Sequence, residues 1–355
     1  SLGWEYYRLA KIQFGTERVN IGAVKQILNY YLQLNAARPS LLHSLILGLA
    51  DKLIGESNFN LVAFIKIWGI ENLRDDDFEP YVDPSTSNTY SSLAEKVILH
   101  TSKQAVEQID TTMLTALLPL LDKAIFGSAD SIWLKMNKAK ALSSLGQSSK
   151  AFDLALEVTK QKVGDYWAWE FLGNVQKKIS FENAFSCYCR ALSVNPKEDF
   201  VGKLRIKLAV MLAEKELYAE AKYEVERVIQ VKKEAQQKVS KDALLLQNQV
   251  WFTSVDAAKD NQKLYSNNIA IAEALLFSTM PWLDACVGNM FSLKDQPHKK
   301  RQIVYVQTDA TKEPVEVALP VGRYAFSGIE LGAGIKIKGE ADSVGRFNVY
   351  QIDAR

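Results

Sequence analysis

The side chains most often used in catalysis and metal binding are few in this sequence. Its histidines are His43, His100 and His298, and its cysteines are Cys187, Cys189 and Cys286. Three cysteines do not make a disulfide framework, and isolated histidines argue against a structural metal site. Cys187 and Cys189 stand two positions apart, so on a helix they point to different faces and cannot form a redox pair. Each fits a small buried apolar position instead.

Other catalytic patterns are also missing. His43 and Ser44 are neighbours in the sequence, but neighbours on a helix do not face each other, and no third group is placed to orient them. The sequence has no phosphate-binding GxxxxGK[ST] loop. The run Asp75-Asp76-Asp77 could ligate a cation, but the spacing and glycine of a calcium loop are absent, which favours a solvated loop. We therefore expect no enzyme, no catalytic residue, no metal and no cofactor.

The amino-acid composition limits the classes of protein to which this chain can belong. The chain has 355 residues, of which 48% are hydrophobic and 24% charged, which excludes a disordered chain. Its 43 Lys and Arg against 41 Asp and Glu leave a net charge of +2, far from that of a nucleic-acid coat. The most apolar stretch, 41–50, is half as long as the roughly twenty residues of a membrane span. These features, with unpaired cysteines, predict a cytoplasmic protein without a membrane partner. Because the sequence lacks an initial methionine, we also expect a fragment or a chain released from a tag.

Apolar residues recur at three- and four-residue spacing up to about Asn289, which is the helical period. Ser40 and Asp110 (or Thr111) are expected helix N-caps, and Gly127 marks an expected helix end. The stretch 74–88, with its acidic triplet and two prolines, is expected to be a loop or a boundary.

The pattern changes near the end of the chain. Six of the 18 glycines lie between Gly322 and Gly345, and apolar residues there alternate with polar ones around 315–319, 335–338 and 347–350. Such alternation predicts half-buried strands. The expected domains are helices at 1–127, helical repeats at 128–236, further helices at 237–297 and a small β domain at 298–355.

Internal repetition is the strongest signal. Ala151, Ala184 and Ala221 are separated by 33 and 37 residues and stand in similar surroundings. The middle unit carries Trp169, the pair Leu172-Gly173, then Ala184, Tyr188, Ala191 and Pro196. This pattern resembles the tetratricopeptide repeat (TPR), a pair of antiparallel helices about 34 residues long. The resemblance covers about 128–236, and the outer units lack the Leu-Gly pair or the proline.

The resemblance implies a mainly α fold, a TPR-like α-α superhelix (a right-handed solenoid), followed by a small antiparallel β domain. It also implies a non-enzymatic scaffold or adaptor that binds a protein or peptide on a concave face lined by the first helix of each repeat. By repeat position, the residues on that face are Trp133, Met136, Lys140, Trp167, Glu170, Asn174, Lys177 and Lys203. Alternatively, Trp133 and Trp167 pack between helices. The Lys and Asn set by which some TPR domains hold a C-terminal carboxylate is not reproduced, because Met136 and Lys140 occupy two of its positions.

The last residues, about 302–355, resemble a cold-shock or OB-type β module, although they are few for a complete five-stranded barrel. Such modules bind single strands through aromatic side chains beside a basic track. The alternative function is therefore binding of RNA or single-stranded DNA, and the combination of repeats and β module is similar to proteins of bacterial mobile-element and defence islands. The candidate residues are Lys299, Lys300, Arg301, Arg323, Tyr324, Phe326, Lys336, Lys338, Arg346, Phe347 and Tyr350. Equally, Lys336 and Lys338 could belong to an ordinary solvent face or edge strand.

Overall fold

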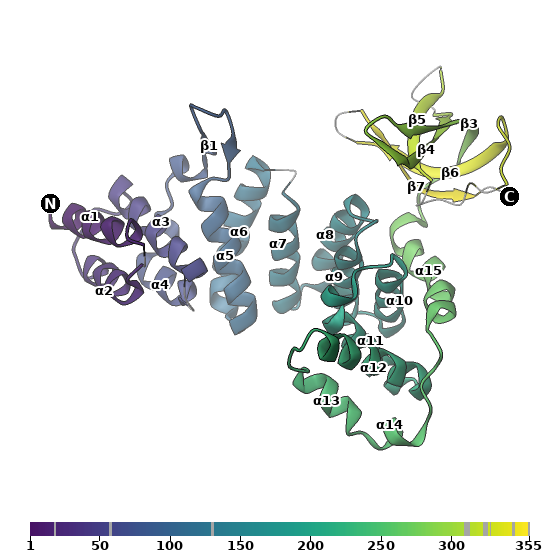
Figure 1. Cartoon of the computed structure of the whole chain (residues 1–355). Coiled ribbons are helices and arrows are strands. Elements are labelled where there is room, and N and C mark those ends of the chain that lie inside the picture. Colours follow the sequence, from purple (N-terminus) through teal and green to yellow (C-terminus); the bar gives the residue numbers. More distant parts are fainter. Residues whose placement is uncertain are drawn as a thin grey trace. The chain divides into compact units, whose positions relative to one another are not determined.

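The computed structural model describes residues 1–17, 19–56, 59–128, 131–308, 313–321, 326, 328–342 and 345–353. The chain divides into two compact units, which we call the helical unit, Ser1–Asn261, and the β unit, Gln262–Arg355. The predicted fold class, a mainly α array followed by a small antiparallel β domain, is confirmed (Figure 1).

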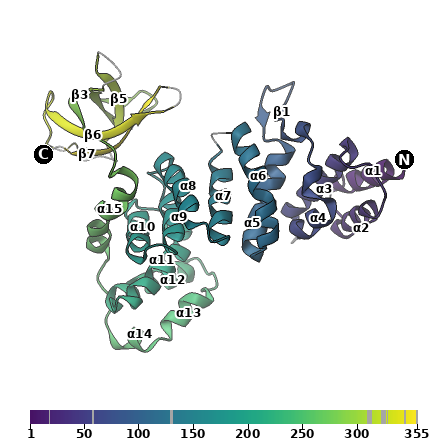
Figure 2. The ribbon, with the colours of Figure 1, turned by 180° about the vertical axis from the view of Figure 1, so that it is seen from behind.

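The helical unit is built from successive helices joined by short connections, which follow one another in chain order in both views (Figures 1 and 2). Its elements are α1 (Leu2–Phe14), α2 (Ile21–Leu32), α3 (Leu41–Glu56), α4 (Leu61–Trp68), η1 (Ile70–Asn72), η2 (Asp75–Phe78), β1 (Tyr81–Val82), β2 (Thr89–Tyr90), α5 (Leu93–Gln108), α6 (Thr111–Gly127), α7 (Ile132–Ser144), α8 (Ser148–Gln161), α9 (Tyr166–Gln176), α10 (Phe181–Ser193), η3 (Glu198–Phe200), α11 (Gly202–Glu214), α12 (Tyr218–Glu234), α13 (Lys241–Gln247) and α14 (Val250–Ser254).

Short polar side chains set where several of these helices begin. The Asp110 side chain accepts a hydrogen bond from the Met113 backbone N–H, and the Ser40 hydroxyl accepts one from the backbone N–H of His43. Each bond satisfies a donor that the first helical turn leaves free. Helix α6 ends at Gly127. All three predicted boundaries are therefore confirmed.

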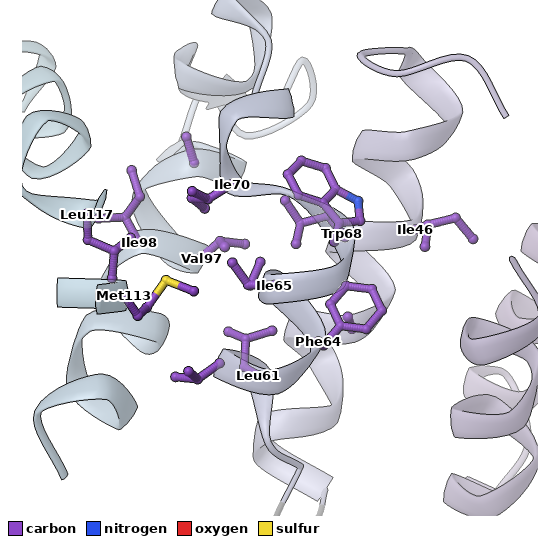
Figure 3. Close-up of a cluster of buried hydrophobic side chains, with 14 of the residues drawn as sticks. Ile46, Leu61, Phe64, Ile65, Trp68, Ile70, Val97, Ile98, Met113 and Leu117 are labelled. Atoms are coloured by element: carbon purple, nitrogen blue, oxygen red, sulfur yellow. The ribbon is translucent and has the colours of Figure 1, made fainter. Parts of the chain in front are cut away.

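One apolar core runs from α1 into α7 without a break. It includes Ala10 of α1, Trp68 of α4, Leu117 of α6 and Ala141 of α7. Figure 3 shows its centre, where side chains of α3, α4, α5 and α6 converge around Ile65. The helices before the repeats therefore share a core with the first repeat helix, although their sequence lacks the repeat pattern.

The repeat alanines lie in the interior of the helical unit. Ala151, Ala184 and Ala221 are all fully buried. A Cβ on Gly173 would lie 2.5 Å from Cε1 of Tyr188, so α9 and α10 approach each other through the bare backbone of that glycine. Small residues at these positions permit the tight pairing that the repeat pattern predicts.

The acidic triplet is not simply a solvated loop, and that prediction is wrong for one of its members. Asp77 is buried in η2, where its carboxylate accepts hydrogen bonds from the Ser44 hydroxyl at 2.7 Å and the Arg74 backbone N–H at 2.9 Å. The Arg74 guanidinium lies 3.2 Å from the same carboxylate. Asp77 thus fastens this segment to α3, because a buried carboxylate must be paired.

The β unit consists of α15 (Gln262–Phe277) and the strands β3 (Leu283–Leu293), β4 (Gln296–Val306), β5 (Val315–Pro320), β6 (Gly334–Ala341) and β7 (Phe347–Asp353). The strands are antiparallel and ordered β5-β4-β3-β6-β7. The predicted strands at 315–319, 335–338 and 347–350 are confirmed. The helical period expected up to Asn289 is wrong over its last residues, because the helix ends at Phe277 and β3 begins at Leu283.

Strand β3 pairs with both β4 and β6 and carries an irregularity between Val287 and Met290. Gly288 lies at this point, and a Cβ there would be 2.7 Å from Cε2 of Tyr305 on β4. The glycine therefore lets the tyrosine ring lie against the backbone of β3. A bulge of this kind bends and twists a strand.

Candidate functional site

Four helices of the helical unit contribute to one exposed surface, which we call the odd-helix face. It consists of exposed or half-buried side chains on α5, α7, α9 and α11: Lys103, Glu107, Trp133, Lys140, Trp167, Glu170, Asn174, Lys203 and Lys207. These residues recur because α7, α9 and α11 are the first helices of successive repeats.

A pair of tryptophans joins the first two repeats on this face. The rings of Trp133 and Trp167 are stacked, with centroids 5.4 Å apart and an interplanar angle of 23°. Trp133 is 55% exposed. Trp169, the tryptophan of the repeat pattern described above, is fully buried. The core of these repeats therefore uses Trp169, and the Trp133 side chain presents an aromatic surface to solvent.

A polar cluster lies beside the tryptophans, where α9 meets α11. The Lys207 ammonium donates to the carboxylate of Glu170 at 2.7 Å and to the amide oxygen of Asn174 at 2.9 Å. The Tyr188 hydroxyl donates to the same amide oxygen at 2.9 Å. Two donors thus fix the orientation of Asn174, so its N–H groups point away from them.

Lys140 is a half-buried cation on the odd-helix face. Burial lowers the pKa of its ammonium below the usual range, and the positive charge of Lys103 lowers that pKa further, while Glu107 and Glu170 oppose the shift. Its ammonium lies 6.0 Å from the ring centroid of Phe171. Within the described part of the chain it makes no hydrogen bond or ion pair. Lys140 therefore has no direct polar partner among those residues, although Glu107 and Glu170 act on its charge.

The remaining predicted residues are less engaged. Met136 is half-buried on α7 between Trp133 and Lys140 in the sequence, and Lys177 and Lys203 are exposed at the end of α9 and the start of α11.

Sequence analysis missed Lys103, Glu107 and Lys207. Lys207 could have been found, because it lies four residues after Lys203 and so on the same side of α11. Lys103 and Glu107 could not, because α5 lacks the repeat pattern that would align it with α7.

The nucleic-acid candidates of the β unit do not form one surface. Lys338 is buried, and its ammonium donates to the carbonyl oxygen of Phe277 at the end of α15, at 2.5 Å. The Tyr350 ring stacks on Phe277 at a centroid distance of 5.0 Å. The expectation that Lys338 is a solvent-facing cation is wrong, because α15 covers this part of β6.

Two further aromatic candidates belong to the interior. Phe326 is buried in the apolar core of the β unit, and Phe347 packs against that core. The ring of Phe347 also lies over Gly339, at whose position a Cβ would come within 2.5 Å of it. An exposed role for Phe326 is therefore wrong.

Two of the basic candidates on the surface are paired with nearby acids. Lys336 lies 2.6 Å from Asp284, and Arg346 lies 3.0 Å from Asp342. Lys299 and Lys300 are exposed on β4, and Arg301 is half-buried there. Arg323 and Tyr324 lie outside the described residues.

Strands β3 and β4 also carry two exposed aromatics that sequence analysis missed, because 283–293 was expected to be helical. Phe291 is 40% exposed and Tyr305 is 37% exposed. Phe291 pairs directly with Arg301 across the two strands, which puts the two side chains on one face. Tyr305 lies four residues after Arg301 and so shares that face.

The groups first considered for catalysis are used in packing. Cys187 and Cys189 are fully buried, and burial strongly raises the pKa of both thiols. His43 Nε2 lies 3.0 Å from the carbonyl oxygen of Trp68, and its Nδ1 lies 3.1 Å from the Tyr31 hydroxyl, whereas Ser44 bonds to Asp77. His43 and Ser44 therefore have separate partners, as expected. Among the described residues, no group of three or more His, Cys, Asp or Glu side chains is placed to hold a metal ion. In the same residues, no helix combines the length and apolarity that crossing a membrane requires.

Comparison with known proteins finds a family model that matches one segment of the chain. No curated protein matches the sequence. Among solved structures, the C-terminal part of a TPR repeat-containing protein from Cytophaga hutchinsonii has a TM-score of 0.42 at 12% identity, covering 77% of this chain and 96% of its own. MamA residues 41 to the end, from Desulfovibrio magneticus RS-1, has a TM-score of 0.38 at 13% identity, covering 54% and 96% respectively. A double mutant of MamA from RS-1 gives the same TM-score and identity and covers 55% and 98%. Residues 132–272 match the family model of a domain of unknown function, DUF7017, so the repeats and the segment that follows them are similar to that family.

Proposed function

We propose that the helical unit is a non-enzymatic scaffold that binds an extended segment of a partner protein on the odd-helix face. The observation that supports this most directly is the stacked pair Trp133 and Trp167, whose outer ring is more than half exposed. Tryptophans contribute strongly when they become buried in an interface, and a stacked pair is held rigid before binding. The polar groups around the pair supply hydrogen-bonding partners for a peptide backbone.

The proposal is tested by selecting peptides that bind. A displayed peptide library is panned on the full chain, and the recovered peptides are synthesised and titrated against variants. Trp133→Ala with Trp167→Ala should weaken binding about thirtyfold, because truncating a central aromatic anchor costs about 2 kcal/mol or more. The matched control is Phe126→Ala on α6, which removes a ring that is 92% exposed but lies off this face.

Unfolding curves of all variants accompany the titrations. The proposal predicts unchanged binding for Phe126→Ala, and for the double variant a cooperative unfolding transition whose free energy falls by about 1 kcal/mol, the worth of the lost aromatic contact. If the selected peptides bind the double variant as tightly as the original chain, the odd-helix face is not the binding surface.

A second function is supported by the aromatic and basic side chains of β3 and β4. We infer that this strand pair binds single-stranded nucleic acid through Phe291, Tyr305, Lys299 and Arg301. The strand order β5-β4-β3-β6-β7, in which β5 also contacts β7, supports an OB-type barrel, and exposed aromatics beside cations suit stacked bases and phosphates.

Polarisation of a fluorescein-labelled oligothymidylate tests this second function. Binding should weaken linearly in log-log form as salt increases, and Phe291→Ala with Arg301→Ala should reduce affinity about tenfold or more. Lys336→Ala is the control, because that lysine is already paired with Asp284. Absence of binding at low salt would rule the function out.

A further inference from the structure

The odd-helix face carries a charge pattern that defines its ligand more closely. Two other lysines act on the charge of Lys140 of α7: Lys103 of α5 and Lys207 of α11. Glu170, one of the two acids in this environment, is already engaged by Lys207 at 2.7 Å. Lys140 is half-buried and has no hydrogen bond or ion pair of its own among the described residues, and a partly buried charge interacts more strongly with an opposite charge than one in open water.

Lys140 is also at a fixed distance from the tryptophan pair. It follows Trp133 by seven residues on α7, so both lie on the same side of the helix. Seven residues correspond to about 10 Å along a helix axis. A peptide in the polyproline II conformation rises about 3.1 Å per residue with three residues per turn, so side chains three positions apart share one face and lie about 9 Å apart along the peptide.

We propose that the ligand of the odd-helix face is a peptide with an aromatic side chain and, three positions away, an acidic side chain. The aromatic residue packs on Trp133 and Trp167, and the carboxylate pairs with Lys140. The inference rests on the proposed protein-binding function and adds the chemistry of the partner. Charge complementarity carries it, because an acid at this point compensates a cation that no described residue pairs.

The probes are synthetic peptides with one phenylalanine and one glutamate in a Gly/Ser background, at separations from one to six residues. All are acetylated and amidated, so the glutamate supplies the only carboxylate. The full chain is labelled with 5-fluorotryptophan, and the resonances of Trp133 and Trp167 are assigned with Trp→Phe variants. Their ¹⁹F shifts report binding at this face directly.

We expect the Phe-x-x-Glu peptide to bind most tightly and its glutamine counterpart to bind about fivefold more weakly, with the difference shrinking at high salt. Lys140→Gln should abolish the preference for glutamate while leaving the affinity for the glutamine peptide unchanged. Lys140→Arg should restore the preference. Lys150→Gln, which changes an exposed lysine of α8 outside the odd-helix face, should not affect it.

The outcomes separate this inference from the function on which it rests. If the peptides shift the Trp133 and Trp167 resonances but glutamate and glutamine bind equally, the acidic ligand is wrong and the binding face stands. If a peptide with a free C-terminal carboxylate in place of the glutamate binds better, the face recognises a chain end instead, and the inference is overturned. If no peptide moves either resonance at millimolar concentration while library selection yields peptides that do, the aromatic-acid spacing is wrong. Failure of both experiments removes the binding face itself.

Discussion

The helical unit and the β unit place residues of the same kinds by different rules. In the helical unit, Trp133 and Trp167 are 34 positions apart in the sequence, yet their rings stack. In the β unit, Lys336 and Lys338 are two positions apart on one strand, yet the first is exposed and the second is buried under α15. Repeat spacing thus predicts neighbours across helices, whereas alternation along a strand predicts exposure only when nothing else covers that strand.

The largest effect expected from this comparison concerns the tryptophans of the first two repeats. Trp169→Ala should cost about 3–5 kcal/mol of unfolding free energy, because its ring is fully buried and its Nε1–H donates to the Val163 carbonyl at 2.9 Å. Trp133→Ala should cost about 1 kcal/mol, the worth of one exposed aromatic contact. Urea unfolding followed by far-ultraviolet circular dichroism measures both. Equal costs would show that Trp133 is a core residue and that repeat position does not separate face from interior.

The next effect tests the close approach of paired helices. Gly173→Ala should cost about 1–3 kcal/mol, because the new methyl group would overlap the Tyr188 ring. Gly164→Ala is the matched control, since no atom lies within 4 Å of the position that its Cβ would occupy, and its effect should stay within about 0.5 kcal/mol. The same urea titration applies. A neutral Gly173→Ala would mean that α9 and α10 pair more loosely.

The two lysines of β6 offer the corresponding test in the β unit. Lys338→Met should destabilise that unit by about 1–3 kcal/mol, because the Phe277 carbonyl loses its buried charged donor and keeps only the Met280 backbone N–H at 3.2 Å. Lys336→Met removes an exposed ion pair and should cost less than about 1 kcal/mol. Hydrogen exchange of peptides from β6 reports the local opening of the strand. If exchange rises equally in both variants, the two lysines are equivalent after all.

The smallest effect is a pH dependence that should belong to the helical unit alone. Burial lowers the pKa of His43 below its usual value of 6.5, so the unfolded chain takes up the proton first as the pH falls. Stability of the original chain should therefore decrease as the pH falls through and below 6.5. His43→Gln should flatten this decrease, and replacing His298 of β4, which is exposed, should not. A decrease of the same slope in the His43→Gln variant would assign it to other groups.

Much of the helical unit could be predicted from the sequence because its determinants are local. The spacing of Ala151, Ala184 and Ala221 predicts the helix pairs. Asp110 predicts the start of a helix because its own side chain caps the first turn. The contribution of α5 to the odd-helix face was missed because contacts from Lys103 depend on how that helix packs, which no spacing in its sequence reveals. In the β unit, strand alternation was recognised at 315–319, but Phe291 was assigned to a helix and Lys338 to solvent. Both errors have the same cause, since the pairing of β3 and the position of α15 are set by contacts between distant parts of the sequence.

The core that runs from Ala10 to Ala141 bears on how this protein can be cut. Similarity to the DUF7017 family begins at residue 132, which is the start of α7. A truncation there would remove the apolar residues that pack against Leu134 and Ala141 and would expose this apolar side of α7 to water. The segment that matches the family model and the segment that we expect to fold by itself therefore start at different residues. We expect a shortened protein to stay monomeric only if it retains the preceding helices or receives a polar cap in their place.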